Sequence, residues 1–260
     1  MADKDGAARH EREMAGGSST ADFSEALARG LAVLAAFDSE HRHRTQADLA
    51  RQLGLSRATV RRAVLTLEHL GYLQAEGRTY RLTPQILDLA GGYLTSNPVS
   101  TVLQPVCDRI CAQLDEACSA AVLDGKDAVI VARAVPNRLI AVGAGIGYRT
   151  PIAISSLGKV LLAHLDADER AAVRATLDGA PDTLDDHTLD SIRVDGFSYV
   201  ANDVEMGSHS IAVPLRRWDD RVIAAIHVGC NIESISPADM HDEVLQLLTA
   251  AADEVRPRLV

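Results

Sequence analysis

Apolar residues recur at helical spacing in three segments near the start of the chain, at residues 23–37, 46–53 and 57–70. Between the second and third segments, Gly54 can adopt a positive φ at a helix end and Ser56 can cap the next helix. Two short runs typical of strands follow, at residues 72–74 and 79–82. Three helices with a glycine-centred turn and a trailing hairpin predict a winged helix-turn-helix domain over residues 22–83.

The segments on either side of this domain have different patterns. Residues 1–21 are charged, rich in small residues and without the apolar core of a signal peptide, so we expect a disordered tail. Pro84 can open a further helix, and Pro98 follows a polar break at its end. We therefore expect a linker helix over residues 84–97 and a second domain over residues 98–260.

The second domain mixes strand and helix patterns. Runs typical of strands lie at residues 119–123, 128–135, 139–142, 197–200, 208–215 and 222–229. Helical spacing occurs at residues 101–114, 155–165, 169–177 and 237–255. Two connections have the composition of hairpin turns, at residues 124–127 and 219–220. This order predicts an α+β fold with an antiparallel sheet covered on one face.

Charge is distributed unevenly along the chain. The formal net charge is −10, and residues 98–260 carry 14 basic and 24 acidic side chains. Residues 41–81, in contrast, carry eight arginines against three acidic side chains. Such a basic patch on an acidic protein can be a solvated helix face, a contact for an acidic protein, or a surface that binds a polyanion.

The third predicted helix carries the densest part of this patch. Val60, Val64 and Leu67 form its buried stripe, and the arginines lie largely off that stripe. An arginine can donate two hydrogen bonds to guanine or a charged bond to phosphate, and a helix N-terminus favours anions. We therefore favour double-stranded DNA as the partner. The candidate DNA-binding residues on this helix and on the predicted wing are Ser56, Arg57, Thr59, Arg61, Arg62, Arg78 and Arg81.

The sequence offers little for metal, cofactor or membrane binding. Cys107 and Cys111 lie one helical turn apart and could suit a metal, but no histidine or second cysteine pair lies at finger spacing. Buried thiols in a reducing cytoplasm are the favoured interpretation. The glycine-rich run at residues 143–147 lacks the spacing of a dinucleotide loop, so no cofactor is expected. No apolar run reaches ~18 residues, so no membrane span is expected.

A small-molecule metabolic enzyme acting on organic acids is the alternative function. Its chemistry would use His187, His209 or His227 together with Ser210 or Cys230. No nucleophile elbow or metal triad occurs at a recognisable spacing, so we expect no catalytic residues and no enzyme.

Two polar residues interrupt apolar strand runs in the second domain. Strict alternation places Arg133 on the same face as Val129 and Val131. A charge in that position must be paired, exposed or functional, so Arg133 is either a partner for a ligand carboxylate or half of a structural salt bridge. Arg149 is a second candidate for the carboxylate. His227 is either a ligand residue or a hydrogen-bonded core histidine.

Five stretches occur in the same order as in a known family. They read SRATVRRAVLTLEHLGYL, RLTPQILDLAGGYL, AVLDGKDAVIVARAV, SSLGKVLLA and GSHSIAVPL. With these motifs, residues 24–255 resemble the IclR family of bacterial transcriptional regulators, in particular the branch that controls aromatic-acid catabolism through the β-ketoadipate pathway. The resemblance implies a winged helix that binds DNA, a GAF-like effector-binding domain over residues 98–260, and homo-oligomers, either dimers or tetramers.

The resemblance also implies a small-molecule carboxylate effector, an aromatic acid or its ring-cleavage product, in control of a catabolic operon. The site would lie on one face of the sheet beside the helix that begins near residue 155, whose N-terminal N–H groups can hold a carboxylate. His209 replaces a commonly basic residue, so the charge of the site is expected to differ. Matched by motif, the effector-binding residues are Ser156, Leu157, Asp203, Ser210, His227 and Gly229, with Arg133 added from its place in the apolar run.

Overall fold

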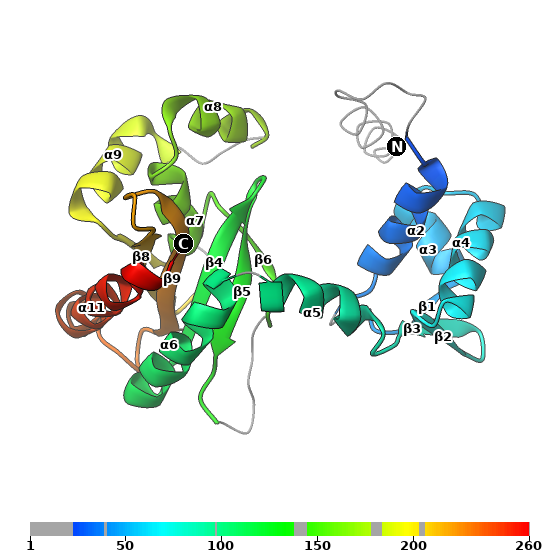
Figure 1. The fold of residues 1–260 in the computed structure, drawn as a ribbon, viewed down its shortest axis with the longest axis horizontal. Coiled ribbons are helices and arrows are strands. Elements are labelled where there is room, and N and C mark those ends of the chain that lie inside the picture. Colours follow the sequence, from blue (N-terminus) through cyan, green and yellow to red (C-terminus); the bar gives the residue numbers. More distant parts are fainter. Residues whose placement is uncertain are drawn as a thin grey trace. The chain divides into compact units, whose positions relative to one another are not determined.

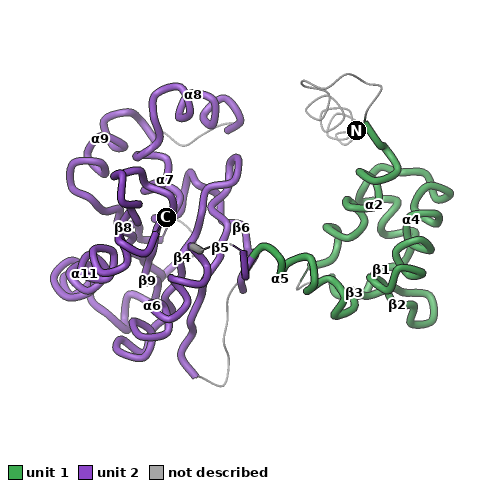
Figure 2. Tube along the Cα trace, in the orientation of Figure 1, with its two compact units in different colours: residues 1–93 green, residues 94–260 purple. Residues whose placement is uncertain are grey.

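A computed structural model describes residues 23–38, 41–96, 98–137, 145–177, 184–202 and 206–259 of the protein. The chain divides into two compact units, Met1–Tyr93 (unit 1) and Leu94–Val260 (unit 2), which Figure 2 colours separately. The sequence predicts the domain boundary a few residues later, at the break before Pro98.

Unit 1 combines helices with a small sheet (Figure 1). Within its described residues, the helices before and after the Gly54 turn are α2 (Glu25–Ala35), α3 (Gln46–Leu53) and α4 (Arg57–His69). Its antiparallel strands, in the order β1-β3-β2, are β1 (Arg44–Thr45), β2 (Leu73–Glu76) and β3 (Thr79–Leu82). This arrangement confirms the predicted winged helix-turn-helix. Strand β1 was not predicted because two residues are too short to show a period.

Local signals determine where the helices of unit 1 begin and end. The Thr45 hydroxyl accepts a hydrogen bond from the Asp48 N–H, and the Asp48 carboxylate accepts one from the Thr45 N–H, which forms a capping box at the start of α3. Gly54 ends α3 with a φ of 64°, in the left-handed region that favours glycine. Ser56 then caps α4. The turn between α3 and α4 therefore has the chemistry that the sequence predicts.

The buried stripe of α4 packs into a single core in unit 1. Val60, Val64 and Leu67 are buried as predicted, and α2 and α3 contribute Val33 and Leu49 to the same core. Because one side of α4 is committed to this core, its remaining sides are left for solvent or a ligand.

Helix α5 (Ile86–Ser96) follows the wing and crosses the division between the two units. It corresponds to the predicted linker helix, although its first helical residue is Ile86 rather than Pro84. None of its residues is buried, and Leu87, Leu89 and Tyr93 are among the exposed large apolar side chains.

Unit 2 contains one six-stranded antiparallel sheet in the order β6-β5-β4-β9-β8-β7 (Figure 1). Its strands are β4 (Ala117–Asp124), β5 (Asp127–Ala134), β6 (Arg149–Pro151), β7 (Ser198–Ala201), β8 (Ser208–Arg216) and β9 (Val222–Asn231). Its helices include α6 (Pro98–Leu114), α7 (Ser156–Ala163), α8 (Ala167–Ala175) and α9 (Asp186–Asp195). The chain ends with α10 (Pro237–Asp239), the π-helix η2 (Met240–Val244), α11 (Leu245–Val255) and the 3-10 helix η3 (Arg256–Arg258).

Both faces of this sheet are packed. On one face, α6 and α11 cover strand residues such as Ile226 and Val228; on the other, α7 and α9 cover strand residues such as Ala212 and Ala225. We call these the α6 face and the α7 face. The prediction of a sheet covered on one face is therefore wrong. Strands β8 and β9 are apolar at successive positions, which is the pattern of a strand buried on both sides.

Strand β5 contains a bulge at Val131, two residues before Arg133. The register between β4 and β5 passes over Val131, which is the extra residue. A bulge reverses the alternation of side chains beyond it. Val131 packs into the core on the α6 face, whereas Arg133 lies beside Ser119 on the α7 face. The prediction that Arg133 shares a face with Val129 and Val131 is therefore wrong.

Other elements of unit 2 also differ from the pattern in the sequence. Neither β6 nor α9 was predicted, and the single helix expected at residues 237–255 is divided by the π-helix η2. The strand predicted at residues 139–142 lies outside the described residues. Helix α9 has clear end signals, since Asp185 caps its start and Gly196 ends it with a φ of 78°.

Gly158 in α7 is a position without room for a side chain. A Cβ atom there would lie 2.2 Å from the Cα of Ile152. We expect Gly158→Ala to lower the free energy of unfolding by ~3 kcal/mol or more, because backbone must move to admit the methyl group. Gly92→Ala in α5 is the control: nothing lies within 4 Å of its Cβ, so helix propensity predicts a gain of up to ~1 kcal/mol. Urea unfolding followed by circular dichroism measures both, and unchanged stability of Gly158→Ala would contradict the close packing.

Candidate functional sites

Helix α4 presents its arginines to solvent. Arg57, Arg61 and Arg62 are exposed, and none forms an ion pair with another described residue. Arg57 and Arg61 lie one turn apart, so their like charges cost an isolated helix roughly 0.2–0.5 kcal/mol. A bound polyanion would turn this repulsion into attraction.

Two hydroxyl groups close the N-terminus of α4. Ser56 Oγ accepts a hydrogen bond from the Thr59 N–H at 3.2 Å, and the Ser56 and Thr59 hydroxyl oxygens lie 2.9 Å apart. Ser56 therefore caps the helix, and the Thr59 hydroxyl lies against the capping oxygen. Their hydroxyls keep further hydrogen-bonding capacity, because each has one donor and two lone pairs.

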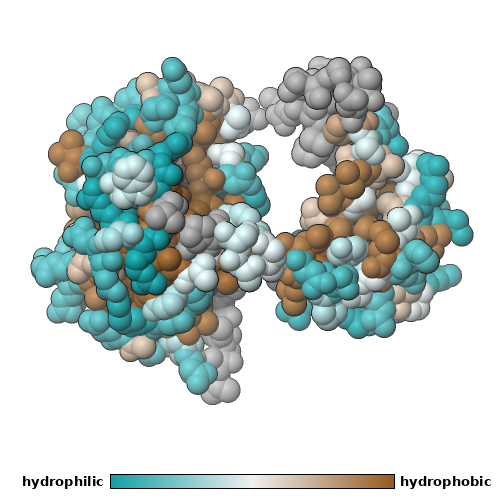
Figure 3. Space-filling view, viewed as in Figure 1, coloured by the Kyte–Doolittle hydropathy of each residue, from teal (hydrophilic) through white to brown (hydrophobic). Residues whose placement is uncertain are grey.

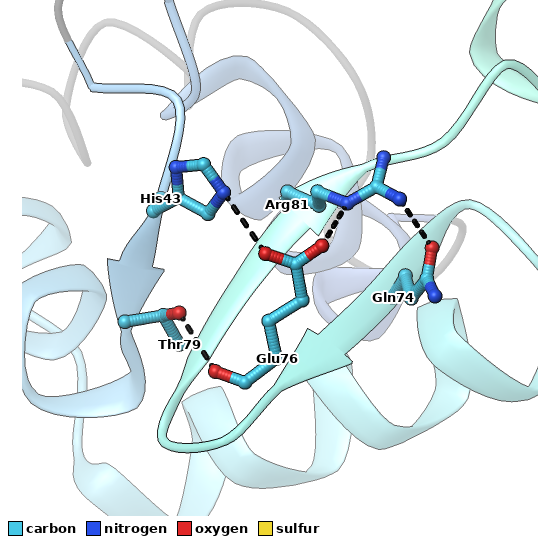
Figure 4. Close-up of polar contacts among 5 residues, drawn as sticks. All are labelled: His43, Gln74, Glu76, Thr79 and Arg81. Atoms are coloured by element: carbon cyan, nitrogen blue, oxygen red, sulfur yellow. Dashed lines mark hydrogen bonds and ion pairs between the residues drawn. The ribbon is translucent and has the colours of Figure 1, made fainter.

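The two arginines of the wing differ in their surroundings. Arg81 Nε donates to Glu76 Oε1, and Arg81 Nη2 donates to Gln74 Oε1 at 2.6 Å, while His43 Nε2 lies 3.1 Å from Glu76 Oε2 (Figure 4). The hydrogen bond from Arg81 is the main cause that lowers the pKa of Glu76. Arg81 is thus already paired with a carboxylate. Arg78, exposed at the turn, has no ion pair with a described residue.

In unit 2, the N-terminus of α7 lies against strand β8. Ser156 Oγ is 2.8 Å from Ser210 Oγ. Ser155 Oγ accepts a hydrogen bond from the Gly158 N–H at 3.1 Å, so the cap leaves the N–H groups of Ser156 and Leu157 to other partners. The Leu157 side chain is buried in the core, so this residue can offer only its backbone.

Arg133 lies on the same α7 face, on β5, with strands β4 and β9 between it and β8. Its Nη1 donates to Ser119 Oγ at 2.9 Å, and it forms no ion pair with another described residue. Burial lowers the pKa of its guanidinium. Arg149, in contrast, donates to the carboxylates of Asp127 and Asp124 at 2.9 and 2.8 Å. Among the described residues, a structural salt bridge therefore accounts for Arg149 and not for Arg133.

His227 on β9 lies directly across from Ser119 in the sheet register. Burial, and secondly the charge of Arg133, lower the pKa of His227 to about 3, so the imidazole is neutral at neutral pH. Its Nδ1 is buried and has no hydrogen-bond partner within the described part of the chain. Buried polar atoms are normally paired. The described residues therefore do not provide the partner that the alternative of a hydrogen-bonded core histidine requires for His227 Nδ1. Gly229 keeps the space beside it open, because a Cβ would come within 3.5 Å of both His227 Cε1 and Ser210 Cβ.

These residues form one constellation on the α7 face, which we call the polar cluster. Sequence reasoning missed one member, Ser119, because its position opposite both Arg133 and His227 depends on the strand register. Asp203 lies outside the described residues. The cluster combines one cation, a neutral imidazole, hydroxyl groups and a helix N-terminus, which together suit a small anion with further polar groups. Its members are Ser119, Arg133, Ser156, Ser210, His227 and Gly229.

His209 lies on the opposite, α6 face. Its Nδ1 is 2.9 Å from the Tyr199 hydroxyl and its Nε2 is 3.2 Å from Cys230 Sγ. Burial lowers the pKa of this imidazole. Alternation along β8 directs Ser210 and His209 to different faces, so His209 does not contribute to the charge of the polar cluster.

The remaining chemistry of the chain is modest. All four cysteines, at positions 107, 111, 118 and 230, are buried and free of disulfides. No cluster of three or more His, Cys, Asp or Glu side chains suited to a metal occurs among the residues described. Within the same ranges, no helix has both the length and the apolar character needed to cross a membrane.

Each of the two units matches a known protein domain. The IclR helix-turn-helix domain matches residues 26–77, and the C-terminal domain of the bacterial transcriptional regulator IclR matches residues 91–256. The Pca regulon regulatory protein of Pseudomonas putida is 37% identical over 245 residues, which are 90% of this chain and 84% of that protein.

Solved structures agree in fold. A putative transcriptional regulator, RHA06195, from Rhodococcus sp. RHA1 aligns with a TM-score of 0.79 and 35% identity over 91% of this chain and 98% of its own. A double mutant of the PobR transcription factor inducer binding domain from Acinetobacter, in complex with 3-hydroxybenzoic acid, aligns with a TM-score of 0.55 and 29% identity. That alignment covers 60% of this chain and 97% of the PobR domain.

The two matched domains together span most of the described residues, including α4 and the strands and helix of the polar cluster. The relatives are regulators of transcription, which excludes the alternative of a metabolic enzyme. The chain belongs to the IclR family of bacterial transcriptional regulators.

Proposed function

We propose that this regulator binds its operator through α4 and the wing, and that a carboxylate effector bound at the polar cluster changes that binding. One observation carries the effector proposal: Arg133 is a half-buried guanidinium without a carboxylate partner among the described residues. Burying a charge without a counter-charge is unfavourable. An effector carboxylate would supply the missing partner through charge-assisted hydrogen bonds.

The composition of the polar cluster favours an aromatic monocarboxylate over a ring-cleaved dicarboxylate. Arg133 is its one positively charged member, so a second carboxylate would lack a matching cation within the cluster. His227 and the serine hydroxyls suit a neutral polar substituent such as a ring hydroxyl. The PobR inducer binding domain in complex with 3-hydroxybenzoic acid supports the same chemical class. The genes controlled would then belong to the catabolism of such an acid.

On the DNA side, the exposed arginines of α4 are the proposed sequence-determining contacts, and the wing is the proposed backbone contact. Arg78 is available for phosphate, whereas Arg81 must first leave Glu76. The proposed DNA-binding residues are Ser56, Arg57, Thr59, Arg61, Arg62, Arg78 and Arg81.

Substitution of Arg61 and Arg78 separates these two kinds of contact. We expect Arg61→Ala to cost ~1–3 kcal/mol of affinity for a duplex that the wild type selects from a random pool, with a smaller loss on a scrambled duplex. Arg78→Ala should weaken both duplexes alike and reduce the log–log salt slope by about one, because phosphate contacts carry no sequence information. Fluorescence anisotropy titrations at several salt concentrations measure both effects.

Arg217→Ala is the matched control for these titrations. Arg217 is also an arginine near the surface, but it is paired with Asp219 in unit 2. It should bind both duplexes as the wild type does. If Arg61→Ala and Arg78→Ala also give wild-type curves, the basic patch is a solvated face and not a DNA surface.

A thermal-shift screen with benzoate, 4-hydroxybenzoate, 3,4-dihydroxybenzoate and 3-oxoadipate tests the effector site. An acid at 100 times its Kd should stabilise the protein by ~2.7 kcal/mol. We expect the hydroxybenzoates to give the largest shift in melting temperature. Arg133→Gln should lower the affinity for the tightest-binding acid by about tenfold or more, since a hydrogen bond to a charged group contributes ~1.5–3 kcal/mol. Arg149→Gln is the control and should retain wild-type affinity. The site assignment fails if none of the four acids binds the wild type, or if Arg133→Gln binds as tightly.

We further propose that the protein is a homo-oligomer, a dimer or a tetramer, assembled in part through unit 1. Leu27 and Leu31 on α2, and Phe23 just before it, follow a four-residue spacing and are 64%, 54% and 47% exposed. Figure 3 shows apolar residues gathered over α2 on the viewed face of unit 1. Helix α5 likewise buries none of its apolar residues within one chain. A second copy would cover both surfaces.

The double substitution Leu27→Asp with Leu31→Asp tests this assembly. Two carboxylates in the contact should lower the mass measured by sedimentation to that of a smaller species, because buried charges oppose association. Val194→Asp is the control, since Val194 is 85% exposed in unit 2 and should leave the mass unchanged. A wild type that sediments as a monomer would contradict the proposal directly.

A further inference from the structure

The side-chain amide of Gln104 on α6 is paired with the backbone of Arg133 on β5. Gln104 Nε2 donates to the Arg133 carbonyl oxygen at 2.9 Å, and the Arg133 N–H donates to Gln104 Oε1 at 3.1 Å. Gln104 Nε2 also donates to Asp108 Oδ1 at 2.9 Å. Both N–H groups and the carbonyl of the amide are therefore used, which fixes its orientation.

This contact takes the place of a neighbouring strand. Strand β6 pairs with β5 at residues 127–129, and Gly147 and Tyr148 continue the backbone hydrogen bonds to Ile130. Within the described residues this pairing does not reach Arg133. The Arg133 N–H and C=O point away from β4, and Gln104 provides the donor and acceptor that another strand would provide. An amide from a helix thus holds the edge of the sheet at one residue.

Arg133 is held from two directions. Its backbone is bound by Gln104, and its guanidinium donates to Ser119 within the polar cluster. A ligand that draws the guanidinium away from Ser119 must move the Arg133 side chain. If the edge of β5 moves with it, Gln104 must move too, because two hydrogen bonds join it to the Arg133 backbone. The bulge at Val131 lies two residues before Arg133, so the ladder constrains the strand less there.

Gln104 belongs to α6, the helix that follows α5 along the chain. Helix α6 begins at Pro98, and α5, which crosses from unit 1, ends at Ser96. Pro105 follows Gln104 directly and removes one N–H from the helical ladder, so this is a position where α6 can bend. The covalent path from the DNA-binding unit to the polar cluster therefore runs through α5 and α6 to Gln104.

We propose that Gln104 is a positioning residue that couples occupation of the polar cluster at Arg133 to helix α6, and through α5 to the DNA affinity of unit 1. The inference rests on the proposed effector site. Its chemistry is specific: a donor and an acceptor on one rigid amide hold both backbone groups of the residue whose side chain binds the effector carboxylate. Coupling of this kind requires that the effector favour one of two arrangements of the pair.

Gln104→Met in the full-length chain tests the coupling. Methionine keeps the length of the side chain and the helix propensity but removes all three hydrogen bonds. The probes are the duplex selected by the wild type and whichever of the four acids named above binds the wild type most tightly. We expect that acid to change the operator Kd of the wild type by about tenfold or more, and that of Gln104→Met by less than about twofold.

The separate affinities distinguish coupling from a purely structural role. Gln104→Met should bind the acid alone, and the duplex alone, within about threefold of wild type, because it touches neither. Asp108→Ala is the matched control: it removes the third bond of the same amide without reaching β5, and it should couple as the wild type does. Gln104→Glu keeps only the acceptor for the Arg133 N–H and places a second carboxylate beside Asp108, so it should also lose coupling.

Hydrogen exchange provides a measurement that needs no effector. The Arg133 amide should exchange slowly in the wild type and in Asp108→Ala, and at least about tenfold faster in Gln104→Met. Unchanged protection, or full coupling in Gln104→Met with unaltered affinities, overturns the role of Gln104. If no acid binds the wild type at all, the effector site itself is wrong and the coupling role falls with it. If Arg133→Gln loses acid binding while the acid still changes the operator Kd of Gln104→Met as it does in the wild type, the effector site stands and only the role of Gln104 is rejected.

Discussion

The sheet of unit 2 is packed on both faces, and every polar group on those faces must find a partner in a protein interior. Most of the sheet meets this condition with small apolar residues, such as Ala212 and Ala225 on the α7 face. The polar cluster is the exception. There the Arg133 guanidinium has one hydroxyl partner within the described residues, and the His227 Nδ1 has none. Because these groups need partners, an anion of the proposed kind would bind there in preference to water.

The arginines of α4 in unit 1 differ from the polar groups of unit 2, because they are exposed and water can solvate them without a protein partner. Water and salt screen them, so a free α4 tolerates the repulsion between Arg57 and Arg61 at little cost. The same exposure makes them available to phosphates. The acidic excess of residues 98–260 discourages DNA from binding elsewhere, which confines a polyanion to the basic segment. Glu76 lowers the positive charge of the wing, since it already forms an ion pair with Arg81.

The sequence predicts unit 1 closely because the signals there are local. The φ of Gly54, the caps at Ser56 and Thr45, and the buried stripe of α4 each depend on residues within a few positions. The polar cluster depends on pairing between distant strands, and there the sequence predicts less. Ser119 carries no signal of its own. One extra residue at Val131 turns Arg133 to the other face, and alternation along the sequence cannot reveal a bulge that only the partner strand defines.

The alternation of strands also ties the polar cluster to the packing behind it. His209 and Cys230 adjoin Ser210 and Gly229 in the chain, but their side chains lie on the α6 face, where His209 bonds to Tyr199 and Cys230. Each pair shares a peptide unit, so the backbone that carries the α7-face residues is positioned partly by contacts on the α6 face. Gln104 acts on Arg133 in the same way, from a helix that packs on that face. The shape of the polar cluster is therefore set by residues of both layers, although its own side chains lie on the α7 face.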